Sequence, residues 1–263
     1  ADGVMRAYTW VEFRRVTEGT HAPWIAGGVH PSWRGRGLGT AGLAWGEARA
    51  RQLLADVTDD LTQRIRVFVD EHVTGARDMI AAAGFTPLRW YIDMRRDLST
   101  PLPDVTVPDG VTIEPYDAAR QEEVRITHNE AFAADHFGSS PYGPEEWQID
   151  LLDHDKIRLD WSFVALHDDR VIGYTFSGAY DQDWEPQGFT EGWTDLVAVR
   201  REWRGRGIAA ALLVKAMESF RDAGLEYAGL DVDTENPTGA LGTYTRLGYE
   251  RRRGSVCYSK ELR

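Results

Sequence analysis

The sequence predicts an α/β (α+β) protein made of two tandem copies of one domain, each a mixed, twisted sheet flanked by helices. The first observation is a repeat: a strand, a basic glycine-rich turn and a helix follow one another at residues 24–54 and again at residues 193–222. The second is that each copy continues with a buried-type strand and a helix ending at a glycine, Gly84 or Gly248. A repeated pattern of this length favours two related domains over one unrelated large one.

Length and composition narrow the function classes. At 263 residues the chain can form one large or two ordinary domains. The net charge of −12 argues against nucleic acid or an anionic membrane as the main partner, and it is compatible either with a cationic small substrate or with solubility alone. The single cysteine, Cys257, excludes an internal disulfide framework and a multi-cysteine metal site. Four of the seven histidines share no metal-ligand spacing, and no metal is expected; they are His30, His72, His128 and His167. Without a signal peptide or a long apolar run, a cytoplasmic protein is expected.

The elements of the first copy follow from alternation, turn residues and helix caps. The expected strands are 3–15, 24–29 and 65–69, and the expected helices are 40–54 and 74–83. Residues 101–110 contain three prolines and little periodicity, which predicts a linker between a first domain over 1–100 and a second over 111–263.

The second copy contains a longer series of elements. In order, it is expected to hold a strand at 111–113, helices at 118–132 and 144–152, strands at 161–166, 171–180 and 193–199, a helix at 207–222, a strand at 227–232, a helix at 238–247, and strands at 249–252 and 256–260.

The basic turn of the second copy, Arg204-Gly205-Arg206-Gly207-Ile208-Ala209, is the strongest chemical signal. A glycine turn at a helix start leaves backbone N–H groups free to face an anion, and the helix dipole adds positive potential, which together suit a pyrophosphate. The turn lacks the Lys-Ser/Thr ending of a P-loop and the spacing of a dinucleotide fingerprint. The alternative is an ordinary glycine-rich surface turn.

The pattern Arg-x-x-Gly-x-Ala at 204–209 resembles the acyl-CoA pyrophosphate loop of the GNAT superfamily of N-acetyltransferases. The order of elements in the second half is similar to that whole fold, whereas the first half shows only its later part, so the native chain is expected to begin earlier. The resemblance implies that acyl-CoA lies in a wedge where the fourth and fifth strands splay apart.

The resemblance also implies a set of cofactor-binding positions. In the second copy these are Val197, Val199, Arg204, Gly205, Arg206, Gly207, Ile208, Ala209 and Asn236, and in the first copy Val29, Arg34, Gly35, Arg36, Gly37, Leu38 and Gly39. The first domain either binds CoA or only supports the second. Asn236 is expected near the pantetheine, or alternatively near the start of a helix as a cap.

Catalytic roles are carried over from the family by position. Tyr244 stands where family members place the acid that protonates the leaving thiolate; the alternative is a core aromatic residue. The first copy has Ile80 at the equivalent position and His72 in place of Asn236. Because Ile80 cannot donate a proton, the first domain is expected to be non-catalytic.

The base is less clearly indicated, because the family's usual base position falls on Trp193. Strand alternation places Glu191, Trp193 and Asp195 on one face, so Asp195 and Glu191 are the candidate bases, directly or through a water. The alternative is that both are solvated surface carboxylates near the start of the strand, without a catalytic role. His136 and Trp193 are the candidate contacts to the acceptor substrate, although a loop histidine is often merely exposed.

Tandem domains with a reduced first copy resemble the actinobacterial mycothiol synthases, and the likeness extends to segments 94–113 and 129–132. Trp193 departs from that pattern and leaves the acceptor open. We expect acetyl transfer from acetyl-CoA to a primary amine of a small, cationic molecule, since the acidic segment 181–191 would attract one. The alternatives are a mycothiol synthase proper and a non-catalytic CoA-binding sensor or scaffold. Neither nucleic acid nor membrane is expected as a partner, and the protein is expected to be a monomer or homodimer.

Overall fold

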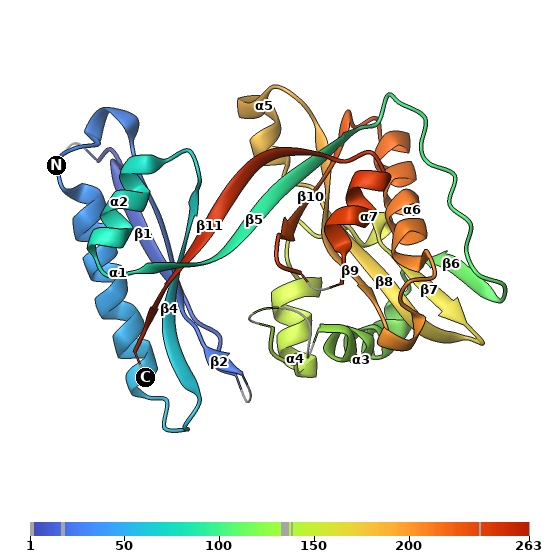
Figure 1. Cartoon of the computed structure of the whole chain (residues 1–263), viewed down its shortest axis with the longest axis horizontal. Coiled ribbons are helices and arrows are strands. Elements are labelled where there is room, and N and C mark those ends of the chain that lie inside the picture. Colours follow the sequence, from blue (N-terminus) through green and yellow to red (C-terminus); the bar gives the residue numbers. More distant parts are fainter. Residues whose placement is uncertain (1–2, 17–18, 133–136, 138, 237, 263) are drawn as a thin grey trace. The chain divides into compact units, whose positions relative to one another are not determined.

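A computed structural model describes residues 3–16, 19–132, 137, 139–236 and 238–262, coloured along the chain in Figure 1. The chain forms two compact units. Unit 1 comprises Ala1–Tyr91, Asp233–Glu235 and Arg253–Arg263, and unit 2 comprises Ile92–Val232 and Asn236–Arg252. The predicted combination of mixed sheet and flanking helices is confirmed.

In unit 1 the strands follow the order β1, β3, β4, β11. Their bounds are β1 (Ala7–Glu12), β3 (Trp24–Val29), β4 (Thr62–Asp70) and β11 (Glu250–Glu261), and the short β2 (Thr20–His21) pairs with β4. The β1–β3 and β4–β11 pairs are antiparallel and the β3–β4 pair is parallel. Helices α1 (Leu38–Ala55) and α2 (Thr74–Ala82) lie on one side of this sheet (Figure 1). They close a core that includes Leu43, Ile65 and Ile80.

In unit 2 the strand order is β6, β7, β8, β9, β10, followed by β5. The bounds are β5 (Thr86–Asp97), β6 (Val111–Pro115), β7 (Phe163–His167), β8 (Arg170–Gly178), β9 (Glu191–Val199) and β10 (Tyr227–Asp233). The strands from β6 to β9 pair antiparallel, and β10 joins β9 in parallel.

Helices cover both faces of the unit 2 sheet. On one face α3 (Gln121–Phe132) and α4 (Pro144–Trp147) contribute Val124 and Trp147 to a core with Phe176 of β8. On the other face α6 (Ile208–Asp222) and α7 (Ala240–Arg246) contribute to the clusters that contain Leu212 and Tyr244. Gly84 and Gly248 follow α2 and α7 with φ of 85° and 83°, as expected for residues that end helices in the left-handed region.

Several predicted elements are divided or extended in the structure. The helix expected over 144–152 is α4 followed by a π-helical turn, Gln148–Leu152. The acidic segment before β9 contains a 3₁₀ turn and the short α5 (Trp184–Gln187). Further 3₁₀ turns lie at Pro31–Trp33, Ala118–Arg120, Leu159–Trp161 and Arg201–Trp203.

The chain crosses between the units inside two long strands. β5 begins in unit 1 and ends in unit 2, and β11 begins in unit 2 and ends in unit 1. The expectation of two final strands, 249–252 and 256–260, was wrong, because the segment between them stays extended and residues 255–261 pair with 64–70 of β4. The division between units therefore lies within β5, ahead of residues 101–110, which form neither helix nor strand.

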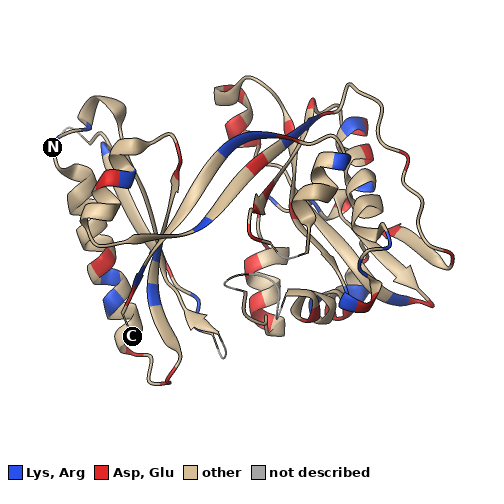
Figure 2. Cartoon of the chain, viewed as in Figure 1, with Lys and Arg blue, Asp and Glu red and all other residues tan. Residues whose placement is uncertain are grey.

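Charged residues of both signs occur on α1 and α6 (Figure 2), so these two helices do not concentrate the net negative charge. Within the described ranges, no helix combines the length and apolar character needed to cross a membrane.

Candidate active site

The wedge expected between two parallel strands is present in unit 2. The β9–β10 ladder runs over the pairs Glu191–Tyr227, Gly192–Ala228 and Trp193–Gly229, although both strands continue beyond it. The strands therefore separate toward their carboxyl ends, and the predicted splay of the fourth and fifth strands is confirmed. Val197 and Val199 lie in the part of β9 beyond that ladder.

The basic turn leads from β9 into α6. Gly205 and Gly207 adopt φ of 74° and 83°, a region that glycine enters without steric cost, and Gly207 is the residue before the first helical turn. A Cβ at Gly205 would meet no atom within 4 Å, so this side of the turn is open. The first N–H groups of an α-helix have no intrahelical acceptor, which leaves those of Ile208 and Ala209 available to an anion.

The two arginines of this turn contact the residues around it. Arg204 donates from Nε to the carbonyl oxygen of Val199 at 3.1 Å and from Nη2 to that of Ala131 at 2.7 Å. The Arg206 guanidinium lies 4.8 Å from the ring centroid of Trp203. The side chain of Arg204 thus ties the turn to β9 and to α3, and the anion-binding capacity rests on the backbone amides.

The turn of unit 1 has nearly the same geometry. Gly35 and Gly37 adopt φ of 72° and 79°. Arg34 Nε donates to the carbonyl oxygen of Val29 at 3.3 Å, and the Arg36 guanidinium lies 4.5 Å from the Trp33 ring centroid. Leu38 and Gly39 begin α1, as Ile208 and Ala209 begin α6.

Asp195 occupies a β-bulge. On β8, Phe176 pairs with Leu196 and the next residue, Ser177, pairs with Thr194, so Asp195 is the extra residue of β9. A bulge redirects a side chain and increases the local twist. Gly178 pairs with Trp193, and a Cβ at Gly178 would lie 2.6 Å from Asp195 Oδ2, so Asp195 and Trp193 share one face of the sheet.

The Asp195 carboxyl group is held at one oxygen only. Tyr180 donates its hydroxyl hydrogen to Asp195 Oδ1 at 2.5 Å, and Oδ2 is buried with no hydrogen-bond partner among the described residues. Burial raises the pKa of Asp195 to about 7; the Tyr180 hydrogen bond opposes the rise and the charge of Asp231 adds to it. A carboxyl group with this pKa can exchange a proton near neutral pH.

Asp231 of β10 is a second carboxyl group on this side of unit 2. It is exposed to solvent, yet the surrounding protein desolvates it and raises its pKa to about 6, with Asp93 of β5 adding to the rise. Glu191, by contrast, is buried and accepts a hydrogen bond from Arg95 Nε at 2.6 Å. This ion pair leaves Glu191 less available to accept a proton than Asp195.

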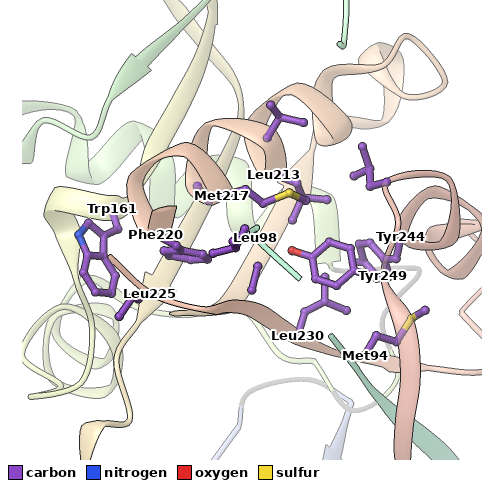
Figure 3. Packing of buried hydrophobic residues seen from close by; sticks show 14 of the residues in the cluster. Met94, Leu98, Trp161, Leu213, Met217, Phe220, Leu225, Leu230, Tyr244 and Tyr249 are labelled. Atoms are coloured by element: carbon purple, nitrogen blue, oxygen red, sulfur yellow. The ribbon is translucent and has the colours of Figure 1, made fainter. Parts of the chain in front are cut away.

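Tyr244 lies on α7 inside the apolar cluster drawn in Figure 3, beside Tyr249 and near Met94 and Leu230. Its ring centroid is 6.1 Å from that of Tyr249. Burial, and next the charge of Asp231, raises the pKa of Tyr244, which keeps the phenol protonated at neutral pH.

The remaining predicted positions differ in what they contact. Asn236 Oδ1 accepts from Thr238 N at 2.9 Å and from its hydroxyl at 2.6 Å, so it fastens the turn before α7. The Trp193 ring lies against β10, where a Cβ at Gly229 would be 2.4 Å away. His136 lies outside the described residues.

The sequence analysis missed Tyr180 and Asp231, which act on Asp195, and Asp93, which acts on Asp231. The acidic Asp231 inside the apolar strand 227–232 was a usable signal, because alternation places it opposite Leu230. No sequence signal pointed to Asp93, because it belongs to a strand that begins in unit 1.

Unit 1 lacks the corresponding polar groups. Its β1–β3 ladder runs without a break from Ala7–Val29 to Glu12–Trp24, so it has no bulge at this point. Trp24 pairs with Arg66 as Trp193 pairs with Gly229, and Phe68 therefore stands where Asp231 stands in unit 2. Ile80 is buried in the unit 1 core, and His72 is exposed.

Within the described part of the chain, no group of three or more His, Cys, Asp or Glu residues is arranged to hold a metal ion.

Comparison with known proteins connects this geometry to a group of enzymes. Residues 126–249 match the acetyltransferase (GNAT) family. The mycothiol acetyltransferase of Thermobispora bispora is 30% identical over 238 residues, which cover 88% of this chain and 74% of that protein. The mycothiol acetyltransferase of Thermomonospora curvata is 32% identical over 238 residues, covering 88% of this chain and 71% of that protein.

Solved structures show the same architecture. A GCN5-related N-acetyltransferase from Sphaerobacter thermophilus is similar to the whole chain, with a TM-score of 0.79, 27% identity and 78% of that protein covered. A tandem GNAT protein from the clavulanic acid biosynthesis pathway has a TM-score of 0.65 and 17% identity, over 91% of this chain and 75% of that one, a likeness of fold.

Proposed function

Because the chain belongs to the GNAT acetyltransferase family, we propose that it transfers an acetyl group from acetyl-CoA to a primary amine of a small, cationic molecule. The observation that carries the proposal is the carboxyl group of Asp195, placed by a bulge beside the β9–β10 splay with one oxygen unpartnered.

Acetyl-CoA is assigned to unit 2. The pyrophosphate would lie on the amides that open α6, and the pantetheine would extend along the unpaired edge of β9 at Val197 and Val199. Holding the thioester beside the amine is the largest contribution to such a reaction, since it makes a bimolecular step effectively unimolecular. Arg204 supports this site by fixing the turn.

The chemical step needs two proton transfers. Asp195 takes a proton from the acceptor's ammonium group, directly or through a water, and the neutral nitrogen then attacks the thioester carbon. A carbon–nitrogen bond forms and the carbon–sulfur bond breaks. Tyr244 gives its hydroxyl proton to the departing thiolate, and its raised pKa keeps that proton in place until it is needed. Glu191 is the second candidate base, and it could accept the proton only after its ion pair with Arg95 breaks.

The acceptor class follows from the charges around Asp195. Asp231 acts on Asp195, Asp93 acts on Asp231, and a cationic acceptor would be attracted to these carboxylates. The Trp193 ring offers an aromatic face to an alkylammonium group. We assign catalysis to unit 2, with unit 1 non-catalytic, because Ile80 replaces the acid and no residue replaces Asp195.

The test is to mix the protein with acetyl-CoA and a panel of cationic, neutral and anionic amines and to follow free thiol. Thiol release that depends on a cationic amine, and that Asp195→Asn lowers by about a hundredfold, is the expected result. Preference for an anionic acceptor would overturn the acceptor class. Binding of acetyl-CoA without release from any amine would instead indicate a CoA-binding scaffold.

The relatives at 30% and 32% identity support one specific alternative, the acceptor used by mycothiol acetyltransferases. Including that acceptor in the panel of amines tests whether this chain uses it. A kcat/KM for it well above that for every other amine would identify the chain as an enzyme of that kind.

A further inference from the structure

We propose that Tyr180 and Asp231 are positioning residues that act on Asp195 in opposite senses: Tyr180 fixes one carboxylate oxygen and favours the ionised form, whereas Asp231 repels that charge. Together they would set the pH at which Asp195 can take a proton from the acceptor. The inference rests on the proposed role of Asp195 as the base.

Tyr180 acts through a direct contact. It follows the end of β8, and its hydroxyl hydrogen is donated to Asp195 Oδ1 at 2.5 Å. Burial, and next the charge of Asp195, raises the pKa of Tyr180, so the phenol remains a donor at all pH values at which an enzyme works. Because Oδ1 is engaged, the buried Oδ2 is the oxygen without a hydrogen-bond partner among the described residues.

The surrounding backbone holds that second oxygen in place. Asp195 is the extra residue of the bulge, and its Oδ2 fills the position where a side chain at Gly178 would begin, 2.6 Å from that Cβ. A hydrogen bond from Tyr180 on one side and a close glycine backbone on the other restrict the rotation of the carboxyl group.

Asp231 acts at a distance. It lies on β10, where Gly229 pairs with Trp193, so Asp231 and Asp195 each stand two residues further along the two neighbouring parallel strands. Its charge raises the pKa of Asp195, while no hydrogen bond between the two is found among the described residues. Asp93 of β5 acts on Asp231 in turn, and Asp155 and Asp231 both act on Tyr180. Glu191, on the same strand as Asp195, is paired with Arg95 and contributes little net charge.

The two residues therefore predict shifts of opposite sign. A hydrogen bond to a carboxylate stabilises the charged form, so Tyr180→Phe raises the pKa of Asp195 and moves the acidic limb of kcat/KM to higher pH, by about one unit. Removing a like charge does the reverse, so Asp231→Asn moves the limb to lower pH, by roughly half a unit.

The experiment measures kcat/KM against pH with acetyl-CoA and the best amine of the panel, for the wild type, Tyr180→Phe, Asp231→Asn and Asp195→Asn. Asp222→Asn, an exposed carboxylate at the end of α6, is the matched control and is expected to leave the limb unmoved. The acceptor's own ionisation is common to all variants and cancels in the comparison. Circular dichroism checks that each variant is folded.

The outcomes distinguish a failure of the positioning roles of Tyr180 and Asp231 from a failure of Asp195 as the base. Limbs that move in opposite directions support the inference. If Asp195→Asn removes the limb but the other two variants leave it in place, or move it the same way, the inference is wrong while the base assignment stands. If Asp195→Asn keeps a normal limb, the proposed base itself is wrong. Should Tyr180→Phe fail to fold, the sign of the Asp231→Asn shift alone still decides.

Discussion

In unit 1, Trp24 contacts Phe68 edge-on, with ring centroids 6.1 Å apart, at the place where unit 2 carries Trp193 and Asp231. The two turns that follow their strands are almost superimposable in backbone conformation, yet Asp195 of β9 has no counterpart in β3. The turn depends on local features, namely glycines and a backbone contact from one arginine. The proposed acid–base set depends on one extra strand residue and on side chains from several strands. The turn can therefore be present without these residues, as it is in unit 1.

The comparison is tested most strongly by changing the acid position in both units. Tyr244→Phe is expected to lower kcat by about a hundredfold while acetyl-CoA affinity stays nearly constant, because the acid acts only on the leaving group. Ile80→Val is the matched change in unit 1 and should leave kcat unchanged, at a cost of about 1 kcal/mol in the free energy of unfolding. Steady-state kinetics and calorimetry measure both. A loss of turnover in the Ile80 variant alone would reverse the assignment of active and inactive units.

A second comparison uses the paired turn glycines. Gly207→Asp places a carboxylate beside the proposed pyrophosphate and forces a left-handed conformation on a non-glycine residue, so the Kd for acetyl-CoA should rise by about tenfold or more. Gly37→Asp should leave turnover unchanged. Calorimetry with each variant also gives the number of CoA molecules bound per chain. If the wild type binds two and Gly37→Asp binds one with unchanged turnover, unit 1 binds CoA without catalysis. Gly207→Ala controls for the backbone effect, and an unaltered Kd in Gly207→Asp contradicts the site.

The smallest expected effect concerns stability. The pKa of Asp195 is raised to about 7 in the folded protein, above its ordinary value of about 4 in an unfolded chain. The folded state therefore binds more protons than the unfolded state between these pH values, and this group's contribution to stability falls as the pH rises through them. Asp195→Asn should raise Tm by a few degrees at pH 8 and not at all below pH 4. Equal Tm values at pH 8 would mean that the carboxylate is not desolvated.

Local sequence signals identified the features that depend on neighbouring residues. The glycine turns, the helix-ending Gly84 and Gly248 and the splay beside β9 all follow from short patterns or from the family resemblance. The site residues themselves stay predictions, with Tyr244 buried in the core and Asp195 at the wedge.

The features that were missed depend on pairing between distant strands. The bulge at Asp195 exists only in register with β8, which no single strand reveals. The pairing of Glu191 with Arg95 and the effect of Asp93 both need β5 in unit 2, whereas the sequence placed residues up to 100 in the first domain. Residues 255–261 gave no local sign that they belong with residues 64–70 rather than with their own half.

The crossing of β11 into unit 1 has a consequence for biosynthesis. A chain leaving the ribosome exposes β4 long before residues 255–261 of β11 are made, so the edge that β11 will cover stays unpaired until those residues have been synthesised. Unit 1 therefore cannot complete its sheet until the residues of unit 2 that precede β11 have been synthesised. A truncation ahead of residue 253 would remove a strand from unit 1, whose other strands are made before most of unit 2.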